Sequence, residues 1–358
     1  MSKIYTVLGL MSGTSLDGVD AAIIETDGET IYTFGPALTC AYTASQRSVL
    51  DRATQAALTW NFDGPPPNIF AEAEDALDAA HRSATAALDI DGVDVIGYHG
   101  QTLLHRPDRY RTLQLGRGQS LATAFACPCI YDFRSADVAA GGQGAPLAPI
   151  YHKALVDHAG LSSVTAVLNL GGVGNVTLID GDRLLASDTG PANGPLDSWL
   201  GGVDDSGTIS REGVPDLARV ETWLKANFFE RAWPKSADRY DFDVLADMAG
   251  MNRTDGAATL AAFTALSVRK TVRQMQVRPD RVIVCGGGRH NRTIMTLLSL
   301  ELGCPVLPAE RFGWDSDAIE AQAFAYLAVR VLRGLPNSFP TTTGVPEPTV
   351  GGVIAYPQ

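Results

Sequence analysis

The chain contains one local pattern twice: an apolar strand, a glycine-rich turn, a second apolar strand and an Asp-Gly pair. The first copy runs from Val7 to Gly28 and the second from Ala166 to Gly181. Apolar runs joined by such turns are typical of β-hairpins. Two copies indicate a duplicated domain, so we expect two related α/β halves with a cleft between them. A chance likeness between two hairpins is the alternative.

The first turn, at residues 12–18, carries more hydroxyl groups and more backbone freedom than a hairpin requires. Gly13 and Gly18 let a ligand approach the backbone closely. Thr14 and Ser15 add donors beside free N–H groups, an arrangement that suits a phosphate. An ordinary hairpin loop explains the same residues, and the repeat of the pattern favours the phosphate interpretation.

Length and charge narrow the function. With 358 residues the chain can form two domains with cores of their own. A net charge of -12 argues against binding to nucleic acid or to an anionic membrane, so a bound phosphate must be held by N–H groups, a metal or a few placed cations. The five cysteines have no framework spacing and fit a reducing compartment. With no leader and no run of 18 apolar residues, we expect a cytoplasmic protein.

Two polar segments in the first half are candidates for ligand contact. The strand at Val93–Tyr98 ends in His99-Gly-Gln-Thr102, and polar residues at the end of a buried strand are where α/β proteins place ligands. A loop histidine that bonds its own backbone is the alternative. Residues 132–137 bring two aspartates and an arginine, and three glycines follow at 141–144. We interpret this stretch as a crossing between domains that also contacts ligand.

A carboxylate in the second half suits proton transfer. The short strand Leu184–Ser187 ends at Asp188, and Thr-Gly-Pro follows. A carboxylate there could take a proton from a hydroxyl group or a water. An Asx-turn or a helix cap is the alternative, and Asp197 fits that alternative better because a helix is expected at 196–200.

A third glycine segment follows the strand Arg281–Cys285. Gly286-Gly287-Gly288 precede a helix expected at 292–302, which would place backbone N–H groups at a nucleotide. The spacing is neither GxGxxG nor a P-loop. The apolar periodicity predicts further helices at 44–58, 68–88, 117–126, 150–159, 217–229, 257–277 and 318–332. We expect Asp255 and Asp317 as helix caps and His81 on a helix surface.

Several motifs together identify a family. They are Gly9–Asp20 (GLMSGTSLDGVD), His99–Thr102 (HGQT), Asp132–Arg134 (DFR), Asp137, Gly141–Pro146 (GGQGAP), Asn169–Gly172 (NLGG), Asp188–Gly190 (DTG), Cys285–Gly288 (CGGG) and Glu320-Ala321. Across its whole length the chain resembles the anhydro-N-acetylmuramic acid kinases. The resemblance implies the actin-like ATPase fold, with two related ribonuclease-H-like α/β domains and a central cleft. We expect an N-terminal domain at 1–131 with 338–358, and a C-terminal domain at 132–337.

The resemblance also implies an activity. Such enzymes use ATP and Mg²⁺ to open the 1,6-anhydro bridge of anhydro-N-acetylmuramic acid with water and to phosphorylate O6. The product, N-acetylmuramic acid 6-phosphate, belongs to peptidoglycan recycling and amino-sugar catabolism. The family's general base falls on Asp188. The implied partners are small molecules, without nucleic acid or membrane, and a homodimer is possible.

The resemblance assigns the remaining site residues. The ATP phosphates would contact Ser12, Gly13, Thr14, Ser15, Leu16, Asp17, Gly18, Val19, Gly171 and Gly172, with Asp17 reaching the metal through water. The adenosine would contact Gly286, Gly287, Gly288 and Asn291. The sugar would contact His99, Thr102, Arg134, Asp137, Gly141, Gln143 and Glu320.

Three positions depart from the family pattern. Ala136 replaces a basic residue before Asp137, which puts recognition of the sugar's lactyl carboxylate in question. Val173 replaces an aromatic residue and Ala192 a glycine. Two other functions stay open: a hexosamine kinase of the same fold, which would consume ATP with N-acetylglucosamine, and a sugar sensor, which would bind ligand without releasing ADP.

Overall fold

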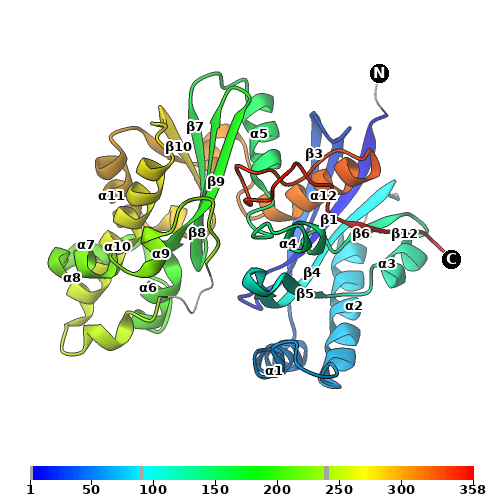
Figure 1. The fold of residues 1–358 in the computed structure, drawn as a ribbon, viewed down its shortest axis with the longest axis horizontal. Helices are drawn as coiled ribbons and strands as arrows, with labels where there is room; N and C mark the ends of the chain where they lie inside the picture. The colour runs from blue at the N-terminus through cyan, green and yellow to red at the C-terminus, as the bar shows by residue number, and fades with distance from the viewer. Residues whose placement is uncertain (1–2, 89–91, 238–241) are drawn as a thin grey trace. The chain divides into compact units, whose positions relative to one another are not determined.

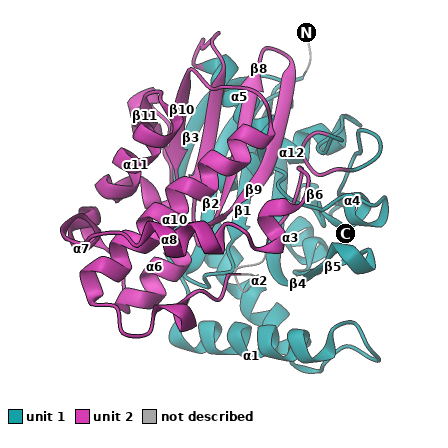
Figure 2. Ribbon diagram, turned by 60° about the vertical axis from the view of Figure 1, so that its left-hand side comes forward, with its two compact units in different colours: residues 1–158, 317–340, 345–358 teal, residues 159–316, 341–344 magenta. Residues whose placement is uncertain are grey.

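The computed structural model describes residues 3–88, 92–237 and 242–358. The chain divides into two compact units: unit 1 holds 1–158, 317–340 and 345–358, and unit 2 holds 159–316 and 341–344 (Figure 2). This division differs from the boundaries expected from the sequence. Residues 132–158 and 317–337 belong to unit 1, and residues 341–344 belong to unit 2. The segment 317–337 joins unit 1 because helix α12 (Ile319–Leu332) packs on the unit 1 strands.

Unit 1 is built on one mixed sheet in the order β12-β6-β4-β1-β2-β3 (Figure 1). Strand β1 pairs antiparallel with β2 and parallel with β4, while β3 pairs antiparallel with β2 and β5 with β4. The strands are β1 (Tyr5–Ser12), β2 (Gly18–Thr26), β3 (Ile31–Ala41), β4 (Val95–Arg106), β5 (Arg111–Leu115), β6 (Cys129–Tyr131) and β12 (Val353–Ala355). The first hairpin is therefore confirmed, with residues 13–17 as its turn.

Unit 2 repeats this topology. Its sheet has the order β11-β10-β7-β8-β9, in which β7 pairs antiparallel with β8 and parallel with β10. Strand by strand, β9-β8-β7-β10-β11 corresponds to β3-β2-β1-β4-β6, with the same directions. The strands are β7 (Thr165–Leu170), β8 (Val173–Asp180), β9 (Arg183–Pro191), β10 (Arg281–Cys285) and β11 (Val306–Pro308). The duplication predicted from the hairpins is confirmed, and each unit has the ribonuclease-H-like order of the actin-like ATPases.

The helices of unit 1 follow the predicted apolar spacing. Thr43 caps α1 with a capping box, in which its side chain accepts from the Gln46 N–H and Gln46 reaches back to the Thr43 N–H. The other helices are α2 (Ile69–Ala87), α3 (Gly118–Phe125), α4 (Ser135–Ala139), α5 (Pro149–His158) and α12, with α1 at Ala44–Trp60 and a 3₁₀ turn η1 at Pro107–Arg109. His81, expected on a surface, is wholly buried on α2, because its ring packs against Tyr98 of β4.

Two glycines let α12 approach the sheet closely. A Cβ on Gly9 of β1 would lie 1.8 Å from the Ala321 carbonyl oxygen, and a Cβ on Gly97 of β4 would lie 2.1 Å from the Phe324 carbonyl oxygen. Only glycine leaves room for the helix backbone at both positions. This contact ties α12, which is distant in sequence, to the strands that carry the first turn.

Helix α10 (Arg253–Gln274) is the central helix of unit 2. It packs against β8 and β9 on one side and against α6, α7, α8 and α11 on others, so most of its residues are buried. The surrounding helices are α6 (Asn193–Leu200), α7 (Thr208–Glu212), α8 (Leu217–Trp223), α9 (Asn227–Glu230) and α11 (Arg292–Leu302). The 3₁₀ turns are η2 (Asp205–Gly207), η4 (Leu245–Met248), η5 (Gly287–His290) and η6 (Ala309–Phe312).

Several predicted element ends are wrong. Strand β9 continues past Asp188 to Pro191, because it stays paired with β8. Helix α6 begins at Asn193, so Asp197 lies inside it and does not cap it. Asn252 caps α10 in place of Asp255, and the residue before α12 is Ala318 in place of Asp317. The helix expected at 217–229 is two helices, α8 and α9. Part of the segment expected to be irregular, 239–246, lies outside the described residues.

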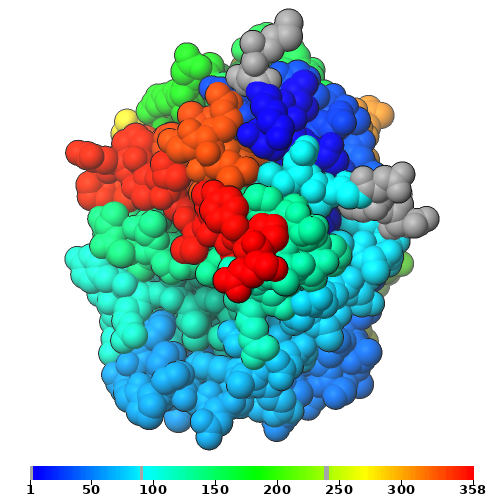
Figure 3. Space-filling view, turned by 90° about the vertical axis from the view of Figure 1, so that its right-hand side faces the viewer, coloured from blue at the N-terminus to red at the C-terminus, as the bar shows by residue number. Residues whose placement is uncertain are grey.

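The C-terminal residues lie on the surface of unit 1 (Figure 3). Strand β12 pairs antiparallel with β6, and the Gln119 side chain of α3 donates to the Tyr356 carbonyl at 2.7 Å. All five cysteines are free thiols. None of the helices that the structure describes is long and apolar enough to cross a membrane.

Candidate functional site

The buried hydroxyl group of Ser12 supports the turn between β1 and β2 from the core side. The Ser12 Oγ lies 2.5 Å from the Tyr42 hydroxyl and donates to the Gln101 side-chain oxygen. The Gln101 amide in turn donates to the Gly13 carbonyl at 3.1 Å. Burial raises the pKa of Tyr42 to about 12, so its hydroxyl remains a donor. The Ser12 hydroxyl therefore supports the turn from inside, and Gln101 is a supporting residue that sequence analysis did not single out.

The tip of this turn is open to solvent. Thr14, Ser15 and Asp17 are exposed, while Leu16 is buried with a φ of 57° and donates its N–H to the Gly13 carbonyl at 3.2 Å. A Cβ on Gly13 would meet nothing nearer than the Ser15 Oγ at 3.6 Å. Leu16 thus anchors the turn to the core and leaves the tip available to a ligand.

Two residues at the end of the turn belong to the sheet. A Cβ on Gly18 would lie 2.3 Å from the Cys40 carbonyl oxygen, so this glycine is required by the packing of β2 on β3. Val19 is wholly buried in the core. We conclude that these two residues shape the turn, and that any side-chain contact with a ligand falls to the exposed tip.

Asp17 is the sequence-based metal candidate. Its carboxylate is 72% exposed and lies 3.9 Å from the Arg47 Nη2. Within residues 3–88, 92–237 and 242–358, no group of three or more His, Cys, Asp or Glu side chains is arranged to hold a metal ion. Mg²⁺ is commonly bound by one or two carboxylates together with substrate phosphates and water, and a single exposed aspartate suits that mode.

The predicted sugar residues His99 and Arg134 contact each other in unit 1. The Arg134 guanidinium lies 3.1 Å from the His99 Nε2 through Nη2 and donates to the Gly144 carbonyl at 2.7 Å through Nη1. The His99 Nδ1 lies 2.8 Å from the Gly100 carbonyl. Burial, and secondly the Arg134 charge, lower the pKa of His99 to about 3. The imidazole is therefore neutral, with its proton on Nδ1 and with Nε2 accepting from Arg134.

Asp137 organises the glycine-rich loop at 141–144. Its side chain is wholly buried, and its Oδ1 accepts from the Gly144 N–H at 2.6 Å. A Cβ on Gly142 would lie 2.2 Å from the same oxygen, so the loop can close around the carboxylate only with glycine there. The Gln143 carbonyl lies 2.8 Å from the His105 Nε2, while Gly141 is exposed. The structure thus joins Arg134, Asp137 and this loop into one assembly.

Thr102 and Glu320 lie at the borders of this assembly. The Thr102 hydroxyl accepts from the Gln114 amide of β5 at 3.2 Å. Glu320 is exposed in the first turn of α12, one turn before Phe324, so both lie on one face of the helix. The Phe324 ring lies 4.6 Å from the His99 ring, centroid to centroid. Helix α12 therefore carries Glu320 on the face whose Phe324 contacts His99.

In unit 2 the two predicted glycine segments lie side by side. Gly171 and Gly172 follow β7, Gly286–Gly288 follow β10, and these strands are parallel neighbours. A Cβ on Gly286 would lie 2.3 Å from the Asn169 Oδ1, and one on Gly288 would lie 2.5 Å from the Leu170 Cβ. No atom lies within 4 Å of a Cβ built on Gly172. Gly286 and Gly288 are therefore needed for packing, while Gly172 leaves open space at the turn.

Asn193 joins the two segments, and sequence analysis did not identify it. Its side-chain amide donates to the Leu170 carbonyl at 3.0 Å, and its backbone N–H donates to the Gly171 carbonyl at 2.8 Å. A Cβ on Gly288 would lie 3.0 Å from its Oδ1. The signal was present, since Asn193 follows the Asp-Thr-Gly-Pro motif closely.

Asn291 has a structural role in addition to any ligand contact. Its side-chain oxygen accepts from the Thr293 and Ile294 N–H groups, which caps α11, and its amide donates to Asp204 at 3.3 Å. The helix expected at 292–302 is confirmed as α11, and the turn η5 stands between Gly286 and this helix. The N–H groups nearest to the triplet are those of η5.

Asp188 lies within β9 and is only 8% exposed. Its Oδ2 accepts from the Ala237 N–H at 2.8 Å, and its own N–H donates to the Lys235 carbonyl at 3.0 Å. One carboxylate oxygen is thereby fixed in direction. Asp197 follows Asp188 by nine positions. Its burial, and secondly the charge of Asp204, raise the pKa of Asp197 to about 6.

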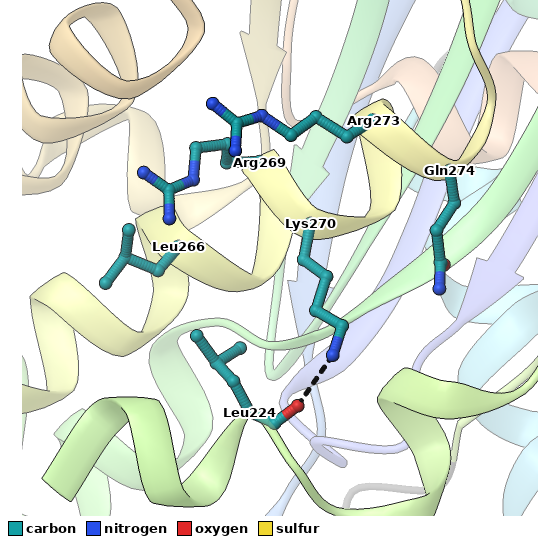
Figure 4. A pocket seen from close by; sticks show the side chains of 6 residues that line it. All are labelled: Leu224, Leu266, Arg269, Lys270, Arg273 and Gln274. Carbon is teal, nitrogen blue, oxygen red and sulfur yellow. Dashed lines mark hydrogen bonds between the residues drawn. The ribbon is translucent and has the colours of Figure 1, made fainter. Parts of the chain in front are cut away.

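A separate hollow of about 370 Å³ lies on the surface of α10 (Figure 4). It is lined by Leu224, Leu266, Arg269, Lys270, Arg273 and Gln274. The Lys270 ammonium donates to the Leu224 carbonyl at 2.9 Å and to Glu230 at 2.6 Å. None of the sequence-predicted site residues lines this hollow.

Comparisons with known proteins place the whole chain in one family. A family model described as anhydro-N-acetylmuramic acid kinase matches residues 5–357. The chain is 48% identical to the anhydro-N-acetylmuramic acid kinase of Mesorhizobium japonicum, covering 99% of this chain and all of that one. It is 49% identical to that of Rhizobium rhizogenes, with the same coverage, and 47% identical to anhydro-N-acetylmuramic acid kinase 2 of a Jannaschia species, covering 98% and 97%.

Proposed function

The chain belongs to the anhydro-N-acetylmuramic acid kinase family, and on this premise we propose that it is an ATP-dependent phosphotransferase acting on anhydro-N-acetylmuramic acid. It opens the 1,6-anhydro ring with water and transfers the γ-phosphoryl group to O6. The product is N-acetylmuramic acid 6-phosphate, an intermediate of peptidoglycan recycling. Relatives that match over their full length with nearly half of the residues identical support the proposal.

The observation that carries the mechanism is the fixed, buried carboxylate of Asp188. Held by the Ala237 N–H, it takes a proton from water as the water oxygen bonds to the anomeric carbon. The bond from that carbon to O6 breaks, O6 bonds to the γ-phosphorus and ADP leaves. Positioning of the water and the phosphate supplies most of the rate enhancement in such a transfer.

Each glycine turn supplies phosphate contacts in this proposal. The exposed tip at Thr14 and Ser15 offers hydroxyl and N–H donors, and the open turn at Gly172 lets a phosphate approach the backbone. The segment Gly286–Gly288 contacts the adenosine. Mg²⁺ would lie on the phosphates with Asp17 reaching it through water, and it would neutralise charge on the transferred group.

The assembly around Asp137 is the proposed sugar site in unit 1. The cation of this assembly is Arg134, which can bind the lactyl carboxylate. Arg134 would thereby serve in place of the basic residue that Ala136 replaces. Gln143, Gly141, Thr102 and Glu320 complete the assignment. Because ATP is the phosphoryl donor and the thiols are free, we place the enzyme in the cytoplasm. A homodimer is a further proposal, which sedimentation analysis would test.

The first experiment supplies ATP, Mg²⁺ and the anhydro sugar in ¹⁸O-labelled water. Label is expected on the C1 hydroxyl of the product, and unlabelled phosphorylated product would refute coupled hydrolysis. ATP consumption with N-acetylglucosamine in place of the anhydro sugar would favour a hexosamine kinase. Sugar binding without ADP release would favour a sensor.

Two variants test the residue roles. Asp188→Asn is expected to lower kcat about 10²–10⁴-fold with ATP binding intact, while Asp180→Asn, at the exposed end of β8, keeps the wild-type rate. Gly172→Ala leaves the fold unchanged and raises KM for ATP about tenfold if a phosphate approaches this turn. Gly202→Ala, equally open, is its matched control. A normal rate for Asp188→Asn would remove the base assignment.

A further inference from the structure

The segment Arg231–Ala237, here called the arm, holds the strand that carries Asp188. The Lys235 carbonyl accepts from the Asp188 N–H at 3.0 Å, and the Lys235 N–H donates to the Ser187 hydroxyl at 3.2 Å. The Ala237 N–H donates to the Asp188 Oδ2 at 2.8 Å. All these contacts use the backbone of the arm, so they depend on how the arm is anchored.

One tie between the arm and α10 is the Trp233 indole N–H, which donates to the Gln274 carbonyl at 3.0 Å. The other, here called the anchor, is the side chain of Lys235. It is 2% exposed, and its ammonium donates to the Gln274 side-chain oxygen at 3.0 Å and contacts the Arg231 carbonyl at 3.4 Å. It also lies 4.7 Å from the centre of the Phe228 ring, a cation–π contact. Gln274 completes the anchor, because its amide donates to the Phe229 carbonyl at 2.9 Å. Figure 4 shows Gln274 on α10, the central helix of unit 2.

The electrostatic surroundings of Lys235 do not by themselves favour a buried cation. The charged groups around it are Arg231 of the arm, Lys270 of α10 and Glu230 of α9, two of them positive. Burial, and then Arg231 and Lys270, lower the pKa of Lys235 to about 8. Among the described residues, no ion pair joins Lys235 to a carboxylate. Lysine is seldom buried without such a partner, so its place here calls for a specific role.

We propose that Lys235 is the positioning residue of the catalytic base. It ties the arm to Gln274 on α10, and the anchored arm presents the Ala237 N–H to the Asp188 carboxylate. The bond from Ala237 fixes the direction of one oxygen and favours the ionised carboxylate. This inference rests on the proposed function, in which Asp188 accepts a proton from water.

The test compares Lys235→Met with Lys270→Met, which removes a cation from the same region without touching the arm. For Lys235→Met we expect kcat to fall about 10-fold to 100-fold, with KM for both substrates within about twofold. In a plot of kcat/KM against pH, the acidic limb should move upward by about half a pH unit. The reason is that the Asp188 carboxylate loses the Ala237 N–H, which favours its charged form. Lys270→Met should keep both properties.

A second variant approaches the anchor from the other side. Gln274→Leu removes the acceptor of the Lys235 ammonium and should shift the acidic limb in the same direction as Lys235→Met. Gln274→Glu loses the bond to the Phe229 carbonyl but keeps the acceptor of the Lys235 ammonium, so it should retain the wild-type limb. If Lys235→Met does not fold, these two variants decide the matter. An unchanged acidic limb in Gln274→Leu would overturn the proposal.

Hydrogen exchange separates this inference from the proposed function. In Lys235→Met or Gln274→Leu, peptides that contain Lys235–Ala237 should exchange about tenfold faster than in the wild type, whether or not the anhydro sugar is turned over. If the wild-type protein shows no kinase activity, the proposed function is refuted, but the hydrogen-exchange comparison still tests whether Lys235 anchors the arm. Unchanged exchange, or a fall in kcat without a shift of the acidic limb, would refute the positioning role.

Discussion

Replacement of the buried His81 is expected to change how the stability of this protein depends on pH. His81 lies on α2 with its ring 4.8 Å from the Tyr98 ring, and its Nδ1 lies 2.8 Å from the Leu77 carbonyl. Its Nε2 is buried and has no hydrogen-bond partner within the described chain. Burial lowers the pKa of His81 from 6.5 to about 4, so the ring is neutral in the folded protein.

The magnitude follows from proton linkage. Between pH 6.5 and pH 4 the unfolded chain binds a proton at His81 that the folded chain does not, so stability falls as the pH falls. From pH 7 to pH 5 this one group removes about 2 kcal/mol of the free energy of unfolding. His81→Leu fills a similar space without a titrating group, and its free energy of unfolding should fall by about 2 kcal/mol less over the same range.

Urea unfolding at pH 7, 6 and 5 measures this difference. The control is His290→Leu, since His290 is exposed on η5, and it should follow the wild type at each pH. Acid-induced losses that are equal in the wild type and in His81→Leu would mean that the ring accepts a proton in the folded state. The argument from burial would then be refuted.

Three further changes can be checked by the same unfolding measurements. Because burial lowers the pKa of Lys235 to about 8, the unfolded chain binds more protons than the folded chain above pH 8. The wild type should therefore gain about 2 kcal/mol relative to Lys235→Met between pH 7 and pH 9.5, and no gain would show that burial does not lower this pKa. Gly97→Ala should cost about 3 kcal/mol, because its Cβ would displace the α12 backbone at Phe324, whereas Gly13→Ala should cost little. Asn291→Ala should cost about 1–2 kcal/mol through loss of the α11 cap, and a smaller loss would show that water replaces the cap.

Candidate site residues could be proposed from the sequence where their chemistry lies in a short stretch of chain. The glycine turns, Asp188 and the residues around Asp137 could be named because spacing and residue type alone indicate a turn or a carboxylate at a strand. Their supporting residues were not found. Each supporting residue is distant in sequence from the residue that it contacts, so no local pattern connects the two. The pairs are Ser12 with Gln101, Asp188 with Ala237, and Lys235 with Gln274.

Sequence by itself determined the repeated hairpins, the strands that begin each half and helices such as α1 with its capping box, because these depend on neighbours a few positions away. Only tertiary structure decided the burial of His81, the length of β9 and the membership of α12 in unit 1. Each depends on a partner from another segment. His81 is buried against Tyr98, β9 continues past Asp188 because it pairs with β8, and α12 packs against Gly9 and Gly97. Packing between distant segments overrides local propensity, since burial and paired backbone groups contribute more free energy than the preference of any single residue.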